Sequence, residues 1–190
     1  LKQALLTHAR NHQRAALLFI DLDNFKSLND TSGHETGDLL LKQVGQRLQG
    51  CVREADTVAR LGGDEFVVML QGLSADPLVA AADAEQVGHK ILLAFAPPFL
   101  LAGREYRSTP SLGITLFGDE DQGVEDLLKQ ADLAMYQAKA AGRDTLRFYD
   151  PRIQARVRMR AQLERDLRDA LEQKQFELFY QAQLHEDRII

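Results

Sequence analysis

The sequence predicts an α+β fold in which helices flank a central, mainly antiparallel sheet with ferredoxin-like character. Three observations lead to this prediction. Short β-prone apolar runs alternate with stretches of helical periodicity, and two adjacent runs are joined by a Gly-Gly pair that suits a tight hairpin turn. The 190 residues, of which 45% are apolar, are also enough for one sizeable hydrophobic core.

The first expected elements are a strand, a loop and a helix. Residues 15–21 form an apolar run that ends in a carboxylate, as expected of a buried strand whose last residue emerges from the sheet. A polar loop follows, through Asn29 and Gly37. Apolar residues at helical spacing then predict a helix over about 38–52, with Asp38 at its N-cap or in its first turn.

Two hairpins are expected from β-prone runs on either side of a glycine. In the first, a Gly-Gly pair at 62–63 tolerates the positive φ of a tight turn. In the second, Pro110 argues for an edge strand or a bulge, because proline cannot donate to a strand ladder. The strands of the two hairpins, followed by a last strand of the domain, are expected at residues 57–60, 66–70, 99–101, 105–117 and 145–149.

Three further helices are indicated by the residues at their ends. Asp76 and the proline after it combine an N-cap with Pro at the first helical position, which opens a long helix. A helical stripe that begins near Val124 ends at Gly142, a suitable residue for the C′ position. A second Asp-Pro pair at Asp150 predicts a helix that continues to about Lys174.

Composition argues against several classes of protein. The longest apolar stretch, residues 91–102, is broken by a Pro-Pro pair and is shorter than the roughly 18 residues needed to cross a bilayer. Residues 1–150 carry 15 Lys and Arg against 21 Asp and Glu, so no binding to nucleic acid is expected of this acidic body. Cys51 is the single cysteine and cannot form an internal disulfide, which favours a reducing, cytoplasmic setting.

Acidic residues stand at the ends of two expected strands. Asp21 and Asp23 end the first strand, and Asp64 and Glu65 lie at the tip of the first hairpin. If that hairpin lies beside the first strand, the carboxylates meet, and their repulsion requires a cation or protons. Mg²⁺ takes one or two carboxylates together with substrate phosphates, so a nucleotide polyphosphate is the expected ligand. The alternative is that acidic residues simply favour turns.

Residues 60–66 read Arg-Leu-Gly-Gly-Asp-Glu-Phe and contain the motif that names the GGDEF family of diguanylate cyclases. The resemblance covers about residues 1–149 and implies the palm-like fold of nucleotidyl cyclases. It also implies an enzyme that condenses two GTP molecules into cyclic di-GMP with release of two pyrophosphates. Because one site binds one GTP, two domains are expected to act as a homodimer. Further blocks similar to those of the family are residues 21–26, 29–38, 111–114 and 131–143.

The resemblance also implies roles for individual residues. Asp21, the Leu22 backbone carbonyl and Asp64 would bind Mg²⁺, with Mn²⁺ as an alternative. Asp64 and Glu65 would be the catalytic residues, with Glu65 as the base for the 3′-hydroxyl. The positions expected to bind GTP are Asn29 and Asp38 at the guanine, Lys139 and Arg143 at the triphosphate, and Phe25 and Lys26 in the phosphate loop.

Each of these GTP-binding positions has a structural alternative. A loop Asn and a helix-capping Asp are common without any ligand. Lys139 and Arg143 are cations near a helix C-terminus, where they would complement the helix dipole. Phe25 would serve equally well as a core residue. Asp144 stands where the family usually has Asn, and its charge beside Arg143 would weaken phosphate binding.

Arg53 and Asp56 resemble the Arg-x-x-Asp of the family's product-inhibition site, where the Arg fork and the carboxylate bind guanines of cyclic di-GMP. The alternative is an ordinary ion pair at a helix end.

The end of the chain resembles a different domain. Residues 150–174 are expected to be a helical linker, and residues 175–190 resemble the start of an EAL domain, the family that hydrolyses cyclic di-GMP, with its first strand at 176–181. The chain lacks an initiator Met and the family's usual opening, so we expect a fragment of a GGDEF-EAL tandem protein, in which a region upstream would carry any membrane attachment. A regulatory GTP-binding module that controls the EAL phosphodiesterase without turnover is the alternative function, and a dimerisation or product-sensing scaffold is a third.

Overall fold

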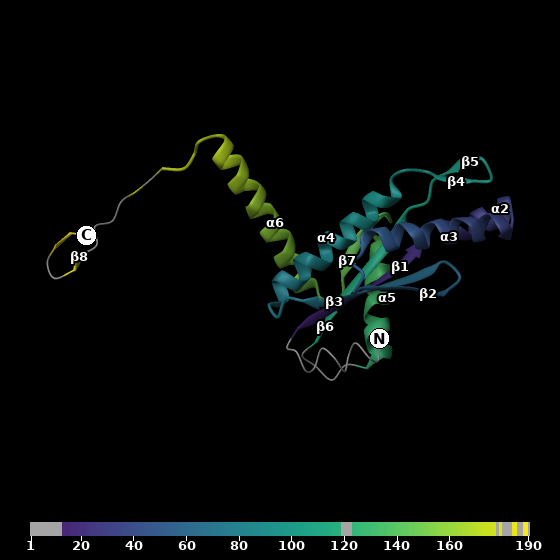
Figure 1. Ribbon diagram of the computed structural model, residues 1–190, viewed down its shortest axis with the longest axis horizontal. Helices are drawn as coiled ribbons and strands as arrows, with labels where there is room; N and C mark the ends of the chain where they lie inside the picture. The colour runs from purple at the N-terminus through teal and green to yellow at the C-terminus, as the bar shows by residue number, and fades with distance from the viewer. Residues whose placement is uncertain (1–12, 119–122, 178, 180–183, 186–187, 190) are drawn as a thin grey trace. The chain divides into compact units, whose positions relative to one another are not determined.

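The computed structural model describes residues 13–118, 123–177, 179, 184–185 and 188–189 (Figure 1). The chain divides into two compact units, residues 1–157 and residues 158–190, and the larger unit contains the sheet and the predicted site residues. In the larger unit, five strands form one sheet in the order β2-β3-β1-β6-β7, and only the β6–β7 pair is parallel. The strands are β1 (Arg14–Leu22), β2 (Thr57–Gly62), β3 (Glu65–Leu73), β6 (Pro110–Phe117) and β7 (Leu146–Phe148).

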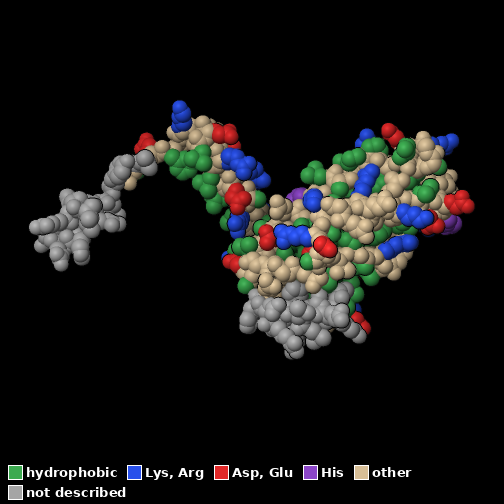
Figure 2. Space-filling view, viewed as in Figure 1, with side chains coloured by type: hydrophobic (Ala, Val, Ile, Leu, Met, Phe, Trp, Pro, Cys, Tyr) green, Lys and Arg blue, Asp and Glu red, His purple; other side chains and the backbone are tan. Residues whose placement is uncertain are grey.

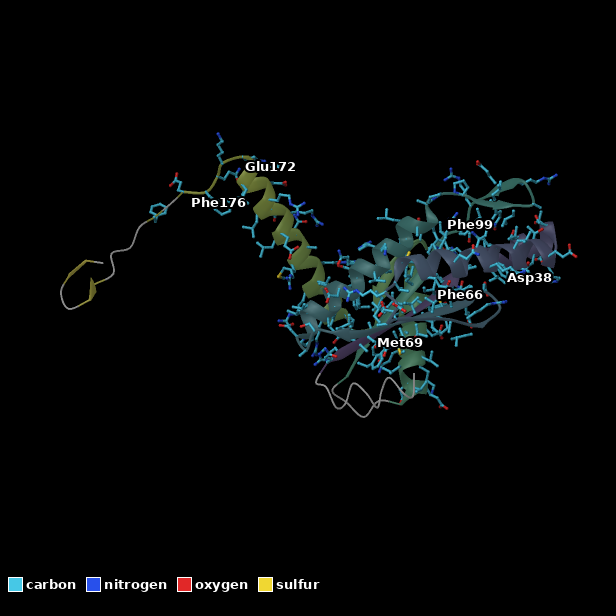
Figure 3. All side chains as sticks on the ribbon, in the orientation of Figure 1. Asp38, Phe66, Met69, Phe99, Glu172 and Phe176 are labelled. Atoms are coloured by element: carbon cyan, nitrogen blue, oxygen red, sulfur yellow. The ribbon has the colours of Figure 1, made fainter. Side chains whose placement is uncertain are left out.

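Helices cover both faces of this sheet, which explains why β1 is apolar along almost its whole length. Alternate residues of a strand point to opposite faces. Leu18 packs in a core cluster with α3 (His34–Cys51) and α4 (Pro77–Phe95), whereas Leu17 packs in a second cluster with α5 (Val124–Ala140). Phe66 and Met69 of β3 divide between the two clusters in the same way (Figure 3). The predicted fold class is therefore confirmed.

The end signals of α4 and α5 act as the sequence predicts. The Asp76 side chain accepts hydrogen bonds from the backbone N–H groups of Leu78 and Val79, at 2.7 and 3.3 Å, and caps α4. Gly142 follows the C-cap of α5 with φ +111°, a conformation that glycine adopts without steric cost.

The expected loop after β1 is wrong, because most of it is helical. Residues Phe25–Ser32 form the short helix α2, and Gly33 separates it from α3. Phe25 and Leu28 are buried and anchor α2 to the core. Asp38 therefore lies inside α3, which begins at His34, and is neither its N-cap nor in its first turn.

The long strand expected over 105–117 is also wrong. The chain first forms a separate hairpin of β4 (Phe99–Leu101) and β5 (Arg104–Tyr106), and then enters the central sheet as β6. Pro110 is the first residue of β6 and pairs with Leu22, so it lies neither on an edge strand nor at a bulge. The first position of a strand tolerates proline because its missing N–H breaks no interior ladder bond.

Arg47 of α3 holds this small hairpin in place. Its guanidinium donates to the carbonyl oxygens of Ala94, Pro97 and Pro98 at 2.7 to 3.0 Å, and it lies 3.6 Å from the centre of the Phe99 ring. Such a contact combines charge-assisted hydrogen bonds with a cation–π interaction.

The predicted last helix is α6 (Pro151–Glu172). Of the expected EAL strand at 176–181, residues 176, 177 and 179 have no regular secondary structure, and residues 178, 180 and 181 lie outside the described residues. The strands β8 (Leu184–His185) and β9 (Arg188–Ile189) pair with each other. None of the helices in the described part of the chain is both long and apolar enough to cross a membrane. Figure 2 shows charged side chains of both signs interspersed on one face of the molecule.

Candidate active site

The acidic residues gather where β1 and β3 adjoin, as the sequence predicts. Asp21 pairs in register with Glu65 of β3 on one side and with Ser111 of β6 on the other. The backbone N–H of Leu22 donates to the carbonyl oxygen of Asp64 at 3.3 Å. The hairpin between β2 and β3 thus brings Asp64 and Glu65 to Asp21, and we call these three residues the acidic corner.

Negative charge is incompletely balanced at the acidic corner. Burial raises the pKa of Asp21, the hydrogen bond from Lys139 lowers it, and the charge of Asp64 raises it further. Burial also raises the pKa of Glu65, followed by the charges of Asp21, Asp64 and Asp132. Both shifts have the sign expected where carboxylates repel one another.

Oxygen donors of this kind fit a hard divalent cation. Asp21 and Asp64 offer carboxylates, and Leu22 offers a backbone carbonyl. Among the residues that the structure describes, no three His, Cys, Asp or Glu side chains are grouped so that they could hold a metal ion by themselves. A cation here would need additional oxygen ligands, as Mg²⁺ does when it binds substrate phosphates.

Lys139, near the end of α5, reaches into the acidic corner. Its Nζ lies 2.7 Å from Oδ1 of Asp21, and 30% of its side chain is exposed. The last carbonyl groups of α5 accept instead from the backbone N–H groups of residues 141–143. Capping of the helix dipole is therefore not the whole role of Lys139, because its direct contact is with a carboxylate.

Asp23 does not share this arrangement, although the sequence placed it among the converging acids. Its side chain is 1% exposed, and both oxygens are occupied by donors from β6, from the segment before β6 and from the turn after α5. Thr109 and Ser111 are its hydroxyl donors, each at 2.8 Å. Sequence reasoning assigned neither of them a role, although Ser111 belongs to one of the recognised blocks.

The residues expected to bind guanine lie at the junction of α2 and α3. Oδ1 of Asn29 is buried, and within the described structure it has no hydrogen-bond partner. A Cβ added to Gly37 would overlap this oxygen and would lie 3.2 Å from Cζ of Phe25. Gly37, to which the sequence assigned no role, thus makes room for the Asn29 amide.

Other predicted GTP-binding residues differ in burial. Asp38 follows Gly37 and is exposed near the start of α3 (Figure 3). Lys26 is exposed on α2, whereas Phe25 is buried in the core, as its structural alternative predicted. Arg143 is exposed in the turn after α5, with Nε 3.9 Å from Oδ1 of Asp23.

Arg53 and Asp56 lie apart from the acidic corner. The Asp56 carboxylate accepts from the backbone N–H of Arg53 at 2.9 Å and from that of Gln71 at 3.1 Å. Gln71 and Glu65 are six residues apart on β3, which corresponds to about 20 Å along a strand. The structure therefore does not bring the expected inhibition site and the acidic corner together.

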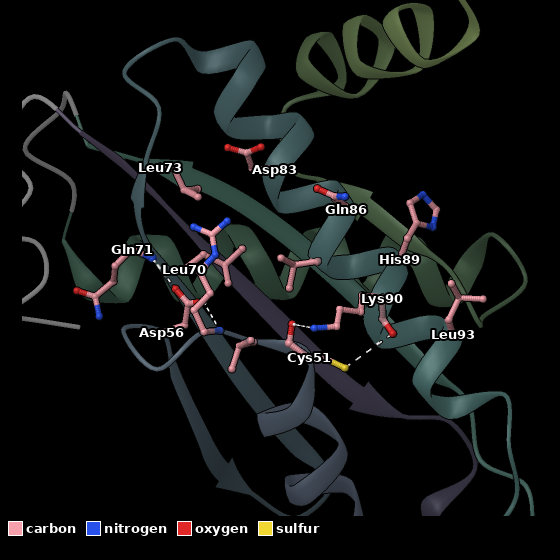
Figure 4. A pocket seen from close by; sticks show the side chains of 13 residues that line it. Cys51, Asp56, Leu70, Gln71, Leu73, Asp83, Gln86, His89, Lys90 and Leu93 are labelled. Carbon is pink, nitrogen blue, oxygen red and sulfur yellow. Dashed lines mark hydrogen bonds between the residues drawn. The ribbon is translucent and has the colours of Figure 1, made fainter. Parts of the chain in front are cut away.

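Arg53 and Asp56 border a pocket of about 460 Å³ formed by the end of α3, β3 and α4 (Figure 4). Lys90 of α4 spans one side of it and donates to the carbonyl oxygen of Cys51 at 3.0 Å. Asp56 holds the backbone of the turn through its hydrogen bonds, which is not the side-chain ion pair of the structural alternative.

The family model described as diguanylate cyclase, GGDEF domain, matches residues 1–145. The chain belongs to this family. Its GGDEF domain is similar to that of solved structures from the same family. The GGDEF domain of TpbB from Pseudomonas aeruginosa is 37% identical, with a TM-score of 0.72 over 78% of this chain and 89% of the other. An EAL/GGDEF protein from M. capsulatus is 40% identical, with a TM-score of 0.68 over 79% of this chain and 94% of the other.

Curated relatives of this GGDEF protein are longer. MucR of Pseudomonas aeruginosa, a bifunctional diguanylate cyclase and cyclic di-GMP phosphodiesterase, is 40% identical over 97% of this chain and 26% of its own length. NbdA of the same organism, a cyclic di-GMP phosphodiesterase, is 39% identical over 87% of this chain and 20% of its own length. The chain thus spans about a quarter or less of these two relatives.

Proposed function

We propose that this domain is a diguanylate cyclase, which condenses two GTP molecules into cyclic di-GMP and two pyrophosphates. The observation that carries the proposal is the acidic corner with Lys139 against Asp21 at 2.7 Å, in a chain of the GGDEF family. This arrangement combines carboxylates for a metal with a cation for phosphates.

Asp21, Asp64 and the Leu22 carbonyl would hold Mg²⁺ or, alternatively, Mn²⁺, which supplies neutralisation of phosphate charge when it is bound. Lys139 and Arg143 bind oxygens of the triphosphate. Because Lys139 balances the charge of Asp21 in the structure, it exchanges a carboxylate for a phosphate when GTP enters.

Asn29 and Asp38 recognise guanine. A carboxylate accepts from the N1–H and the N2 amino group of guanine, and adenine lacks this pair of donors. The side chain of Asn29 lies beside Gly37, and its Oδ1 has no hydrogen-bond partner within the described structure, so this oxygen is available to the base. Lys26 and Phe25 support this region, Lys26 beside the phosphates and Phe25 from the core.

Glu65 accepts the proton of the 3′-hydroxyl of one GTP. That oxygen forms a bond to the α-phosphorus of the other GTP, whose bond to the bridging oxygen breaks as pyrophosphate leaves. Burial raises the pKa of Glu65 toward neutral pH. A carboxylate with a raised pKa is a stronger proton acceptor, which suits a general base. Repetition of the step in the opposite sense closes the ring, so two copies of the domain face each other.

The pocket beside Arg53 and Asp56 is proposed to bind the product. The Arg53 side chain is exposed and available for the O6 and N7 atoms of guanine. An Arg53→Ala variant is expected to lose inhibition by cyclic di-GMP, and an unchanged inhibition curve would contradict this role.

The second candidate function is a GTP-binding module that regulates a cyclic di-GMP phosphodiesterase. It is favoured by the similarity to NbdA, whose name records only phosphodiesterase activity. In this proposal, residues 150–174 link the GGDEF domain to an EAL domain that begins at about residue 175. Both candidates place the domain in the cytoplasm, where GTP is available.

Incubation of the protein with GTP and Mg²⁺, followed by chromatography, distinguishes the two candidates. Accumulation of cyclic di-GMP, abolished by Glu65→Gln, is the expected result. Binding of GTP without any product, unaltered by Glu65→Gln, would overturn the cyclase and support the regulatory module.

A further inference from the structure

We infer that Asp23 is a positioning residue that holds the turn after α5 and thereby sets Arg143 for the triphosphate. This inference rests on the proposed function, since it deepens the role of Arg143 in binding GTP. Asp23 itself would contact neither the metal nor the nucleotide.

The Asp23 carboxylate connects three parts of the fold. Oδ1 accepts from the Ser111 hydroxyl at 2.8 Å, at the start of β6. Oδ2 accepts from the Thr109 hydroxyl at 2.8 Å and from the backbone N–H of Asp144 at 3.3 Å. The Asp23 N–H also donates to the Thr109 carbonyl oxygen at 2.9 Å. The end of β1 is thus tied to β6 and to the turn that follows α5.

This turn has a backbone that requires external support. Arg143 and Asp144 both have positive φ, +64° and +45°, although neither is glycine. Non-glycine residues persist in this conformation when surrounding contacts hold them there. The hydrogen bond from the Asp144 N–H to Asp23 is such a contact, since it fixes the second of the two residues directly.

Charge is the second link between Asp23 and Arg143. The Asp23 side chain is 1% exposed, whereas that of Arg143 is 55% exposed, and the closest approach of the pair is 3.9 Å. A buried carboxylate below an exposed guanidinium attracts its inner edge and leaves the remaining N–H groups free for a phosphate. The carboxylate thereby limits the orientations of the guanidinium before any nucleotide is present.

Direct metal binding is the competing role for Asp23, given its position two residues after Asp21. Its hydrogen bonds argue against that role. Each oxygen already accepts a hydroxyl hydrogen bond at 2.8 Å, and the side chain is 1% exposed, so a cation would have to reach a buried carboxylate that donors from β6 and the segment before it already surround.

The test uses an Asp23→Asn variant and a GTP analogue with a methylene group between its α and β phosphorus atoms, which cannot release pyrophosphate. Asp23→Asn is expected to weaken binding of the analogue about tenfold, as expected for loss of hydrogen bonds to a charged group. Binding of guanosine, which has no phosphate, is expected to be unchanged. Asp169→Asn in α6 is the matched control, because that carboxylate is exposed and distant in sequence from the site.

The same measurements in an Arg143→Ala background decide whether Asp23 acts through Arg143. Asp23→Asn is then expected to cause no further loss of affinity, because the residue it positions is already gone. An equal loss in both backgrounds, or an equal loss for guanosine, would overturn the inference. If Asp23→Asn does not fold, Thr109→Val replaces it, since this change removes one hydroxyl donor to the carboxylate and keeps the shape of the side chain.

Hydrogen exchange of the Asp144 amide gives a readout that requires no nucleotide. Asp23→Asn is expected to speed this exchange while leaving amides in the interior of α5 protected. Unchanged exchange at Asp144 would contradict the role of Asp23 in holding the Asp144 amide. If Asp23→Asn speeds the exchange but the wild-type protein binds no GTP, the contact between Asp23 and the turn is supported and the proposed function is rejected. Failure of the inference and failure of the proposed function therefore give different results.

Discussion

Lys139 and Asp21 form an ion pair of 2.7 Å between the last turn of α5 and the end of β1. The pair joins a residue expected to bind phosphate to one expected to bind the metal. In the ligand-free protein, each therefore serves as the counter-charge that its own ligand would otherwise provide.

Lys139→Ala is expected to raise the KM for GTP at least tenfold, because a charged contact to phosphate is lost. The free energy of unfolding is expected to fall by about 1 to 3 kcal/mol, because the change leaves the buried carboxylate of Asp21 without this partner. Steady-state kinetics and urea denaturation measure the two quantities. Lys129→Ala, an exposed lysine of the same helix, is the control, and an equal effect of both variants would contradict a specific role for Lys139.

Asp64→Asn is expected to stabilise the metal-free protein by about 0.5 to 1 kcal/mol near neutral pH, because it removes repulsion from Asp21 and Glu65. The pKa values of Asp21 and Glu65 are raised in the folded chain. The stability that they contribute is therefore present below their unfolded pKa values and is lost as the pH rises through the folded ones. The difference between variant and wild type should shrink as the pH falls through the raised pKa values of Asp21 and Glu65, because these two carboxyl groups then take up protons.

Urea denaturation with a chelator at several pH values measures this difference. Asp169→Asn, which removes an exposed charge in α6, is expected to have little effect. A destabilised Asp64→Asn at neutral pH would show that the acidic corner is already balanced without a cation.

Gly37→Ala is expected to change nucleotide recognition more than stability. The added methyl group would overlap Oδ1 of Asn29, which is the end of a side chain and can move away. Displacement of the Asn29 amide should weaken GTP binding and reduce the preference for GTP over ATP. Gly45→Ala in the same helix has no atom within 4 Å of the new methyl group and serves as the control. Equal GTP affinity in both variants would contradict the contact.

Gly113→Ala is expected to destabilise the fold by about 1 to 3 kcal/mol or to prevent folding, since the new methyl group would overlap backbone atoms of Ala131 and Met135 in α5. Backbone atoms, unlike the Asn29 side chain, cannot move aside without separating α5 from β6. Gly45→Ala should instead stabilise α3 by up to about 1 kcal/mol. Thermal unfolding compares the two, and a Gly113→Ala protein as stable as wild type would contradict the tight packing of α5 on β6.

Strands β1 and β3 could be predicted from their apolar runs, and helices α4 and α5 from apolar periodicity that agrees with their end residues. Helix α2 could not be predicted, because only Phe25 and Leu28 of its eight residues are buried. Two apolar positions are too few to show a helical periodicity in the sequence. The division of residues 105–117 between the two strands β5 and β6 could not be predicted from the sequence either. It depends on contacts between distant segments, such as the hydrogen bond from the Asp23 N–H to the Thr109 carbonyl.

The acidic corner could be predicted from a hairpin lying beside a strand, which brings Glu65 into register with Asp21. The different environment of Asp23 could not, because its donors come from β6, from the segment before β6 and from the turn after α5. For Asp56, the sequence offered an ion pair with the Arg53 side chain as the alternative to the product-inhibition site. The Asp56 oxygens instead accept from backbone N–H groups, and such donors cannot be recognised from residue type because every residue except proline has one.

Asp21, which is expected to bind the metal, and the amide expected to bind the base belong to different elements, β1 and α2. This separation has a consequence for how such a protein can evolve. The carboxylates expected to bind the metal lie at the end of β1 and just before the start of the neighbouring strand β3, next to buried residues whose substitution would damage folding. The amide expected to read the base instead belongs to an eight-residue helix that only two buried side chains attach to the core. A new nucleotide preference could therefore arise by exchanging a few residues of this peripheral segment, while the reaction itself is inherited intact.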